Sequence, residues 1–219
     1  MVRVEFHCHT IYSKDSLTQP QNLINTCRRK GIHKVVITDH NTIQGAEIAQ
    51  QIAPDLVIIG EEIMTTEGEL LAFFLSEEIP AGLSPQETLD RLRAQEAFVS
   101  VSHPFDHLRA GHWHPEHLRS IVPDLDAIEV FNARCIRSSF NEQAQEFAQE
   151  HKLPGTVGSD AHAAFELGQA SMLLPDFQNA ADLRAVIHQG QPELKISGPW
   201  VRLVSRYAVL YKKLFNPTY

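Results

Sequence analysis

Short apolar segments typical of β-strands recur along this chain, and nearly all run directly into a histidine or an acidic residue. The segments are VRVEFHCH, KVVITDH, LVIIGEE, FVSVSH, AIEVFN and GTVGSDAH, ending in His7 and His9, His40, Glu62, His103, Asn132, and Asp160 with His162. Helical patterns separate the strands, as in βα units. In a parallel α/β barrel the carboxyl ends of the strands meet at one face. The spacing therefore favours a barrel with one shared metal site, because a structural zinc finger clusters its ligands locally.

The alternation predicts an α/β fold of about seven βα repeats. Strands are expected near 2–6, 34–38, 56–60, 69–75, 98–102, 126–131, 155–158 and 171–174. Helices are expected around 20–30, 43–53, 85–95, 139–151 and 180–189. The 69–75 segment is interpreted as forming a hairpin with the strand before it. Residues 103–117 are interpreted as a histidine-rich loop, and long loops in compact domains are usually functional or disordered.

Composition limits the class of protein. A chain of 219 residues that is 43% hydrophobic can bury one continuous core, so residues 1–195 are expected to form a single domain. The formal charge of −8 gives no long-range attraction for nucleic acid, so we expect a small anionic substrate and no stable nucleic-acid partner. Three cysteines without a CxxC pair indicate a reducing cytoplasm. The sequence shows neither a signal peptide nor a membrane span, so a soluble cytoplasmic protein is expected.

The last part of the chain, residues 196–219, has a different character because it holds four basic residues and no acidic one. Its large apolar residues recur at helical spacing, and they are Trp200, Leu203, Tyr207, Leu210, Tyr211 and Leu214. This pattern predicts an amphipathic C-terminal helix. Its apolar stripe is expected to pack on the barrel or on a second subunit of a homo-oligomer. The alternative is a helix that lies on a membrane surface.

The candidate ligands outnumber those that one metal needs. They are His7, His9, Asp15, His40, Glu62, His103, Asp160 and His162. A single catalytic zinc normally takes about three protein ligands, so at least two metals are expected, with Glu62 and Asp160 able to bridge them. Imidazole and carboxylate together suit zinc, manganese or iron. Paired metals activate a shared water and clamp the attacking and leaving oxygens, which favours phosphate-ester hydrolysis.

The motifs that carry these residues resemble those of the polymerase and histidinol phosphatase (PHP) superfamily of metal-dependent phosphoesterases. They are HCHTIYSKDS at 7–16, TDHNT at 38–42, IGEE at 59–62, SHP at 102–104 and GSDAH at 158–162. Each motif is short, but their order and their positions after strands make the resemblance specific. It implies a distorted seven-stranded (β/α) barrel, similar to a TIM barrel, with a trinuclear metal centre.

The resemblance also implies how the ligands divide among the metals. The first metal would be held by His7, His9, Glu62 and Asp160, and the second by Asp15, His40 and His162. Glu62 would bridge to a third metal bound with His103. The nucleophile would be a metal-bound hydroxide, held in place through His7, His9, Asp160 and His162. Glu61 is adjacent to Glu62 but points to the opposite face of the strand, and the GxE pattern favours Glu62 as the ligand.

The third metal site departs from the family pattern. Family members with three metals usually have a histidine where this chain has Asn132, and an amide oxygen is a poorer zinc ligand. The third metal is therefore expected either to bind more weakly or to recruit a histidine from the loop that contains His107, His112 and His114.

Substrate contacts are predicted on fewer signals. Arg134 follows Asn132 at a strand end, where its planar fork can hold a phosphate, and the alternative is an arginine in an exposed ion pair. Asn132 itself is a further candidate substrate contact. Lys14 and Arg109 are weaker candidates and are expected to be solvent-exposed. His107 and its neighbouring loop histidines are candidates for a general acid.

The sequence thus favours a metal-dependent phosphoesterase that acts on a small phosphorylated metabolite or a nucleotide phosphate. A metal-dependent amide hydrolase is the second enzymatic interpretation, because the same metals would activate a water towards a carbonyl. A non-catalytic PHP-type domain that binds a partner through its basic tail is the third. A purely structural barrel has no need to bury so many ionisable groups, which argues against this last interpretation.

Overall fold

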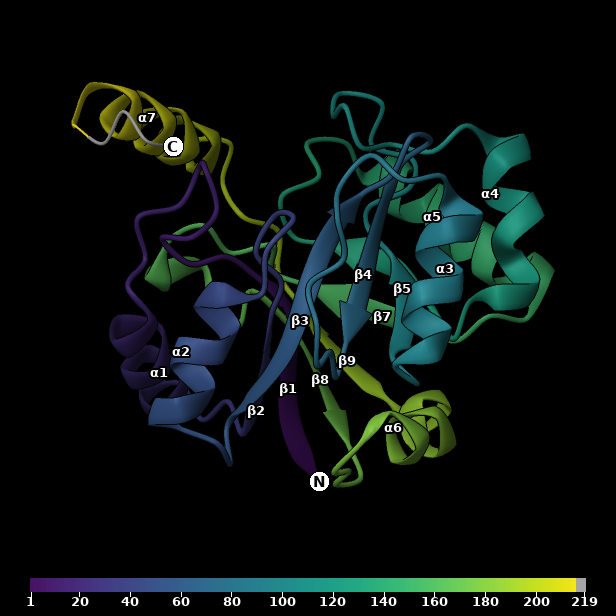
Figure 1. Ribbon diagram of the computed structural model, residues 1–219, viewed down its shortest axis with the longest axis horizontal. Coiled ribbons are helices and arrows are strands. Elements are labelled where there is room, and N and C mark those ends of the chain that lie inside the picture. Colours follow the sequence, from purple (N-terminus) through teal and green to yellow (C-terminus); the bar gives the residue numbers. More distant parts are fainter. Residues whose placement is uncertain (216–219) are drawn as a thin grey trace.

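A curved, mixed β-sheet forms the centre of the computed structural model, which describes residues 1–215 (Figure 1). Its strand order is β5-β4-β3-β2-β1-β8-β9. The strands are β1 Val2–Cys8, β2 Lys34–Ile37, β3 Val57–Met64, β4 Glu69–Phe73, β5 Phe98–Val101, β8 Ala170–Leu174 and β9 Gln191–Leu194. Two further strands, β6 Ile128–Asn132 and β7 Gly155–Gly158, form a separate parallel pair.

The β6–β7 pair completes a ring with β1 to β5. On one side, the backbone amides of Asp126 and Ala127, just before β6, donate to the carbonyl of Val99 in β5. On the other side, Ala161 forms a parallel bridge with Cys8 of β1, and the amide of His9 donates to the Ala161 carbonyl over 2.8 Å. Strands β1 to β7 therefore form a distorted seven-stranded barrel, as predicted, and β8 and β9 extend the sheet beyond β1.

Helices cover both sides of the sheet (Figure 1). In this view α1 and α2 flank one side, and α3, α4 and α5 flank the other. The helices are α1 Pro20–Arg29, α2 Gln44–Ile52, α3 Pro85–Ala94, α4 Pro115–Ile121, α5 Ser138–His151, α6 Ala180–Val186 and α7 Val201–Phe215. A capping box at Ser84 and Glu87 opens α3, with both of its reciprocal hydrogen bonds present.

Alternation along the strands separates the interior of the barrel from its outer layers. In β4, Leu71 and Phe73 join a buried cluster to which β1, β2, β3, β5 and β7 also contribute, and this cluster fills the barrel. Leu70 and Ala72 instead pack outwards in a second cluster that includes residues of α3 and α5. Cys8 lies in a third cluster with residues of α1 and α2, so its role is packing. Successive side chains of a strand point to opposite faces, and this alternation separates the clusters.

The sheet is less parallel than the βα pattern predicts. Strands β3 and β4 form the expected antiparallel hairpin, because the short 65–68 connection cannot supply a parallel crossover. The β4–β5, β1–β8 and β8–β9 pairs are antiparallel as well. The predicted 103–117 loop ends earlier than expected, because Pro115 opens α4. The edge strand β9, QPEL, was not predicted, since it contains a proline and no β-branched residue.

The C-terminal helix α7 packs with a different face from the one predicted. Its buried residues are Val201, Ala208 and Lys212, and the Lys212 amine donates to the carbonyls of Ile11 and Ser13 over 2.5 Å. The apolar stripe is exposed instead. Leu203 is 63% exposed, and the other exposed residues of the stripe are Trp200, Tyr207, Leu210, Tyr211 and Leu214. The expectation that this stripe packs on the barrel is wrong, whereas packing on a second subunit or on a membrane surface stays a prediction.

The predicted C-terminal segment extends to residue 219, and residues 216–219 lie outside the described part of the chain. Among the helices of residues 1–215, none is both long enough and apolar enough to cross a membrane.

Candidate metal centre

All eight predicted ligand residues converge at one end of the barrel. His7 lies in β1 and Glu62 in β3, and the others lie in the loops that follow β1, β2, β5 and β7. Every one of them is buried except His40 and Asp15, which are partly buried. The carboxyl ends of strands far apart in the sequence thus place imidazoles and carboxylates in a single cluster.

The deepest part of the cluster joins His7, His9, Glu62 and Asp160. Nε2 of His7 lies 3.2 Å from Nε2 of His9 and 3.3 Å from Oε2 of Glu62. Nε2 of His9 lies 3.4 Å from the same Glu62 oxygen and 3.3 Å from Oδ1 of Asp160. All four residues are at most 1% exposed, so water cannot compensate their charges. The ligand atoms of His7, His9 and Glu62 lie close enough together to hold one metal ion.

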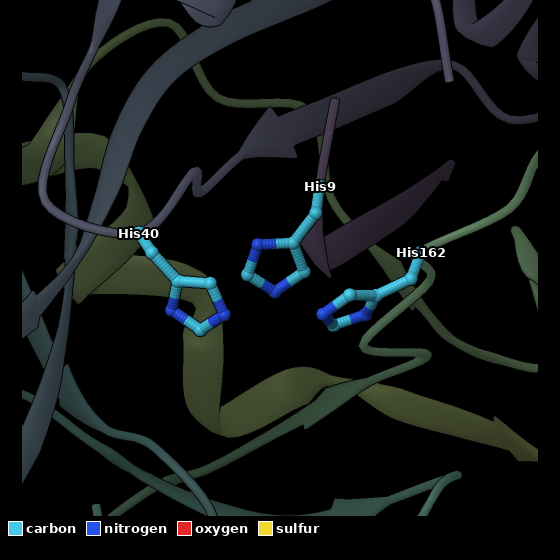
Figure 2. A group of neighbouring side chains, drawn as sticks. All are labelled: His9, His40 and His162. Carbon is cyan, nitrogen blue, oxygen red and sulfur yellow. The ribbon is translucent and has the colours of Figure 1, made fainter. Parts of the chain in front are cut away.

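A second group lies beside the first and consists of His9, His40, His162 and Asp15. Figure 2 shows the three imidazole rings gathered around a common space. Nε2 of His162 lies 3.1 Å from Oδ2 of Asp15, and Nε2 of His40 lies 3.6 Å from the other Asp15 oxygen. These residues also fit a metal ion, so the cluster is suited to more than one metal.

A third group surrounds the far side of Glu62 and includes Glu69, which was not predicted. Nε2 of His103 lies 3.2 Å from Oε1 of Glu62 and 3.6 Å from Oε2 of Glu69. Nδ1 of His40 lies 3.9 Å from Oε1 of Glu69 and 3.1 Å from Oε2 of Glu62. Glu69 packs against Gly111, where an added Cβ would lie 1.9 Å from its carboxylate. The group His40, Glu62 and Glu69 has the spacing of a metal site.

Asn132 lies in the cluster, but its amide is occupied by hydrogen bonds. Its Nδ2 donates to Oε2 of Glu129 and Oδ2 of Asp160, over 3.1 and 3.3 Å. Its Oδ1 accepts from the backbone of Arg134 and from Nη2 of Arg109, over 2.9 and 3.3 Å. Asn132 therefore connects the metal cluster to two arginines.

Within residues 1–215, the contacts of the loop histidines are with groups other than the predicted ligands. His107 is exposed and its ring packs on His112 and Phe140. Nδ1 of His112 lies 2.7 Å from the carbonyl of Arg109, and His114 is exposed. The expected recruitment of a loop histidine towards the third group is not observed, and Glu69 lies there instead.

Glu129 in β6 supports the cluster from behind and was also not predicted. Its Oε1 lies 2.9 Å from Nδ1 of His7, and its Oε2 accepts from the backbone amide of His103 over 2.8 Å. Gly158 makes this contact possible, because a Cβ there would lie 2.3 Å from Oε1 of Glu129 and 2.5 Å from Cβ of His7. A carboxylate behind a histidine fixes the ring orientation and strengthens the ring as a ligand.

Glu61 and Glu62 separate as the strand geometry predicts. Glu62 faces the cluster, whereas Oε2 of Glu61 accepts from the backbone amide of Ile79 over 2.9 Å. Burial raises the pKa of Glu61 to about 8. Burial also opposes ionisation of Glu62, but the imidazoles of His7 and His40 outweigh it and hold the pKa of Glu62 well below its usual range. Glu62 is therefore ionised and available as a ligand.

The donor atoms fit divalent metal ions. Within residues 1–215, four buried side-chain atoms of the cluster have no hydrogen-bond partner, and they are Asp15 Oδ1, Glu62 Oε2, His103 Nδ1 and Asp160 Oδ1. Three of them are carboxylate oxygens, which are costly to bury unless a cation or a donor faces them. Burial and the neighbouring His162 and His40 hold the pKa of His9 well below its usual value, so its ring is neutral, as metal binding requires.

The backbone is strained where it presents two of these side chains. His103 has φ 23° and Asp160 has φ 51°, which is the left-handed region that residues with a Cβ seldom adopt. Such conformations persist where the surrounding structure imposes them, and they cluster at functional sites.

A pocket of about 250 Å³ opens onto the cluster. Its cationic lining residues are Lys14, Arg109, Arg134 and Arg202. Nη1 of Arg109 lies 2.5 Å from Oδ2 of Asp160, and its Nε lies 2.9 Å from Oδ2 of Asp106, so the expectation of a solvent-exposed Arg109 is wrong. Lys14 is exposed, as expected.

Arg134 is only 6% exposed, which excludes the alternative of an exposed ion pair. Its Nη1 lies 2.6 Å from Nδ1 of His162, and its Nε lies 3.2 Å from Oε2 of Glu166. Arg202 comes from α7 and was predicted only as a basic residue of the tail. The pocket thus combines predicted metal ligands with a cationic wall, which consists of Arg109, Arg134 and Arg202.

Comparisons with known proteins point to one family. Residues 5–124 match the family model of the PHP domain, and residues 138–192 match the model described as PHP-associated. The chain is 38% identical over 145 residues to the uncharacterized protein MJ1587 of Methanocaldococcus jannaschii, covering 60% of this chain and 82% of that protein. It is 37% identical over 172 residues to the uncharacterized protein MJ0417 of the same organism, covering 77% and 69%.

A solved structure shares the fold. It is a two-domain protein of Bacteroides vulgatus, described as containing a predicted PHP-like metal-dependent phosphoesterase. The TM-score is 0.73 at 18% identity, and the match covers 89% of this chain and 65% of that one.

Proposed function

This chain belongs to the PHP domain family, and on that premise we propose that it hydrolyses a phosphate ester of a small phosphorylated metabolite or a nucleotide. The observation that carries the proposal is the cluster of buried imidazoles and unpartnered carboxylate oxygens beside a pocket with three arginines. The metal-ligand side chains suit hydrolytic metals, and the guanidinium groups suit a phosphate.

Three groups of residues would hold the metals. His7, His9, Glu62 and Asp160 would hold the first, and Asp15, His40 and His162 the second. His103, Glu62 and Glu69 would hold a third, with Glu69 in the role that Asn132 does not take. The donor set suits zinc, manganese or iron, and such metals, when bound, supply an acidified water and positive charge next to the phosphate.

The residues of this chain would then orient the substrate. Arg109 and Arg134 would donate to phosphate oxygens, and both are already held in place, Arg109 by Asp106 and Arg134 by Glu166. Arginines fixed in this way lose little side-chain entropy on binding and discriminate planar or tetrahedral anions by their fork of donors. Asn132 would keep Arg109 and Asp160 in register, since its side chain contacts both.

The test is metal content combined with hydrolysis. We expect two or three transition metals per chain by elemental analysis, and hydrolysis of a chromogenic phosphomonoester that is lost in His9→Ala. Inorganic phosphate should inhibit the reaction while acetate at the same concentration does not. Hydrolysis of a chromogenic amide with no activity towards phosphoesters would instead support an amide hydrolase. One metal or none, with no activity after manganese or zinc is added, would support a non-catalytic domain.

A further inference from the structure

The C-terminal helix α7 contributes to the wall of the pocket that opens onto the metal centre. Arg202 and Ser205, in the first turns of α7, line this pocket together with Arg109 and Arg134. We infer that Arg202 binds the anionic group of the substrate, so that α7 is part of the substrate site. This inference rests on the proposed phosphoesterase function and adds a substrate-binding residue from outside the PHP-matched segments.

The hydrogen bonds of Arg202 leave most of its donors available. Its Nη2 lies 3.3 Å from Oδ2 of Asp106 and 3.5 Å from the carbonyl of Arg134. These are the hydrogen bonds of its side chain within residues 1–215, and both are long. A guanidinium has five N–H donors, and the side chain of Arg202 is 28% exposed. Arg202 can therefore donate to a ligand in the pocket without breaking a strong contact.

The charges around Arg202 also favour an anion. Asp106 is buried, and the same Oδ2 that faces Arg202 is already paired with Nε of Arg109 over 2.9 Å. A single carboxylate oxygen thus serves two guanidinium groups. The Arg134 side chain lies on the same wall, and its Nη2 donates to the carbonyl of Val201 over 2.9 Å. Arg109 has a second carboxylate partner in Asp160, and Arg134 pairs with Glu166. Within residues 1–215, Arg202 is thus the one arginine of this wall whose only carboxylate partner is shared, and a bound anion would give it a partner of its own.

The packing of α7 ties Arg202 to the rest of the site. Nη2 of Arg134 also donates to Oγ of Ser205 over 2.8 Å, so the first turns of α7 position Arg134 as well. Lys212 fixes the other end of the helix against the loop after β1 through the carbonyls of Ile11 and Ser13. Both ends of α7 are therefore anchored next to predicted ligands, which makes Arg202 a fixed element of the pocket.

The same helix offers a matched control. Arg206 lies one turn after Arg202, carries the same charge and is exposed, and it is not among the residues that line the pocket. Replacing either arginine changes the net charge of the protein equally. A difference between the two variants therefore reports the position of Arg202 and not the charge of the helix.

The experiment uses the metal-loaded full chain and measures binding of inorganic phosphate by calorimetry for the wild type, Arg202→Ala, Arg202→Lys and Arg206→Ala. We expect Arg202→Ala to weaken phosphate binding about tenfold, as loss of a charged hydrogen-bonding group does. Arg202→Lys should recover part of the affinity, because the charge returns without the fork. Arg206→Ala should stay within about twofold of the wild type, as exposed charges contribute little. Metal content and Tm should be the same in all four proteins.

Parallel kinetics on a chromogenic phosphomonoester separate the two proposals. We expect Arg202→Ala to raise KM about tenfold with a smaller change in kcat, since the contact is already made with bound substrate. Equal phosphate affinity in Arg202→Ala and Arg206→Ala, in a wild type that hydrolyses phosphoesters, would overturn the role of Arg202 and leave the proposed function standing. Arg202-dependent phosphate binding without any hydrolysis would overturn the proposed function and support the role of Arg202. A wild type that binds no phosphate would overturn the role of Arg202.

Discussion

The metal cluster and the cationic wall face the same pocket, but they are built differently. Apart from Asp15, the predicted ligands of the cluster lie in barrel strands or within four residues of a strand end, as Arg134 of the wall also does. The other arginines of the wall lie further from the strands, Arg109 in the loop between β5 and α4 and Arg202 in the helix α7. Strand ends have a fixed place in a barrel, and loops and terminal helices acquire theirs only through tertiary packing. The difference teaches that ligands can be predicted from strand pattern, while residues that bind the substrate depend on the packing of loops and the terminus.

The largest effect should come from breaking the cluster at its centre. His9 contacts both the first and the second group, through Glu62 and Asp160 on one side and the ring of His162 on the other. We expect His9→Ala to lower kcat/KM of phosphoester hydrolysis by about a thousandfold or more and to lower the metal content by at least one ion per chain. Elemental analysis and steady-state kinetics on the same preparation measure both quantities.

His188→Ala is the control for that experiment, because His188 is exposed and lies in the segment after α6. It should leave metal content and activity unchanged. A His9→Ala protein that keeps both its metals and its activity would show that the cluster is not the reaction centre.

A smaller effect should come from the residue behind the cluster. Glu129 contacts Nδ1 of His7, and an amide in its place cannot accept as strongly from that ring. We expect Glu129→Gln to weaken metal affinity or activity by roughly 10- to 100-fold, as loss of such supporting carboxylates does. Competition with a chelator of known affinity measures the change, and Glu142→Gln on the exposed face of α5 is the control. Unchanged metal affinity would mean that β1 alone fixes the His7 ring.

The third group can be tested separately through Glu69. We expect Glu69→Gln to remove one metal ion per chain relative to the fully loaded wild type and to lower activity about tenfold, because the neutral amide is a poor ligand. Glu67→Gln is the control, since Glu67 lies two residues away, is partly exposed and pairs with the exposed His117. If Asn132→Ala lowered the metal content and Glu69→Gln did not, the assignment of Glu69 would be wrong.

The reason Glu69 escaped prediction lies in the direction of its strand. The other strand residues of the cluster follow the rule that barrel ligands stand at carboxyl ends. Strand β4 runs antiparallel to β3, with Glu69 opposite Met64, so its amino end lies at the ligand face. The hairpin itself was predicted. That Glu69, the first residue of β4, lies at the ligand face follows only once the register of the β3–β4 pair is known. Glu129 was missed for a related reason, because it lies within β6 and not at its end.

More of the fold than of the cationic wall could be predicted from the sequence. The alternation of strand and helix patterns and the strand-end motifs are local, and they predicted the barrel and its eight converging side chains. The partial burial of Arg109 is not local, since its guanidinium pairs with Asp160 after β7 as well as with Asp106 of its own loop. The expectation that the apolar stripe of α7 packs on the barrel failed for the same reason. Helical periodicity shows that a stripe exists, and only the packing of Val201, Ala208 and Lys212 shows which face meets the barrel.

The smallest effect should come from His107, which was predicted as a substrate contact and a candidate general acid. Its side chain is exposed and packs on His112 and Phe140, and it is not among the residues that line the pocket. We therefore expect His107→Ala to change kcat/KM by no more than about twofold, the range of a surface substitution. Arg109→Ala, two residues away, should lower kcat/KM much more, because Arg109 lines the pocket and pairs with Asp160 of the cluster. A loss of kcat/KM in His107→Ala as large as that in Arg109→Ala would contradict this expectation. It would show that the loop brings His107 into the pocket when substrate binds, so that His107 belongs to the wall as well.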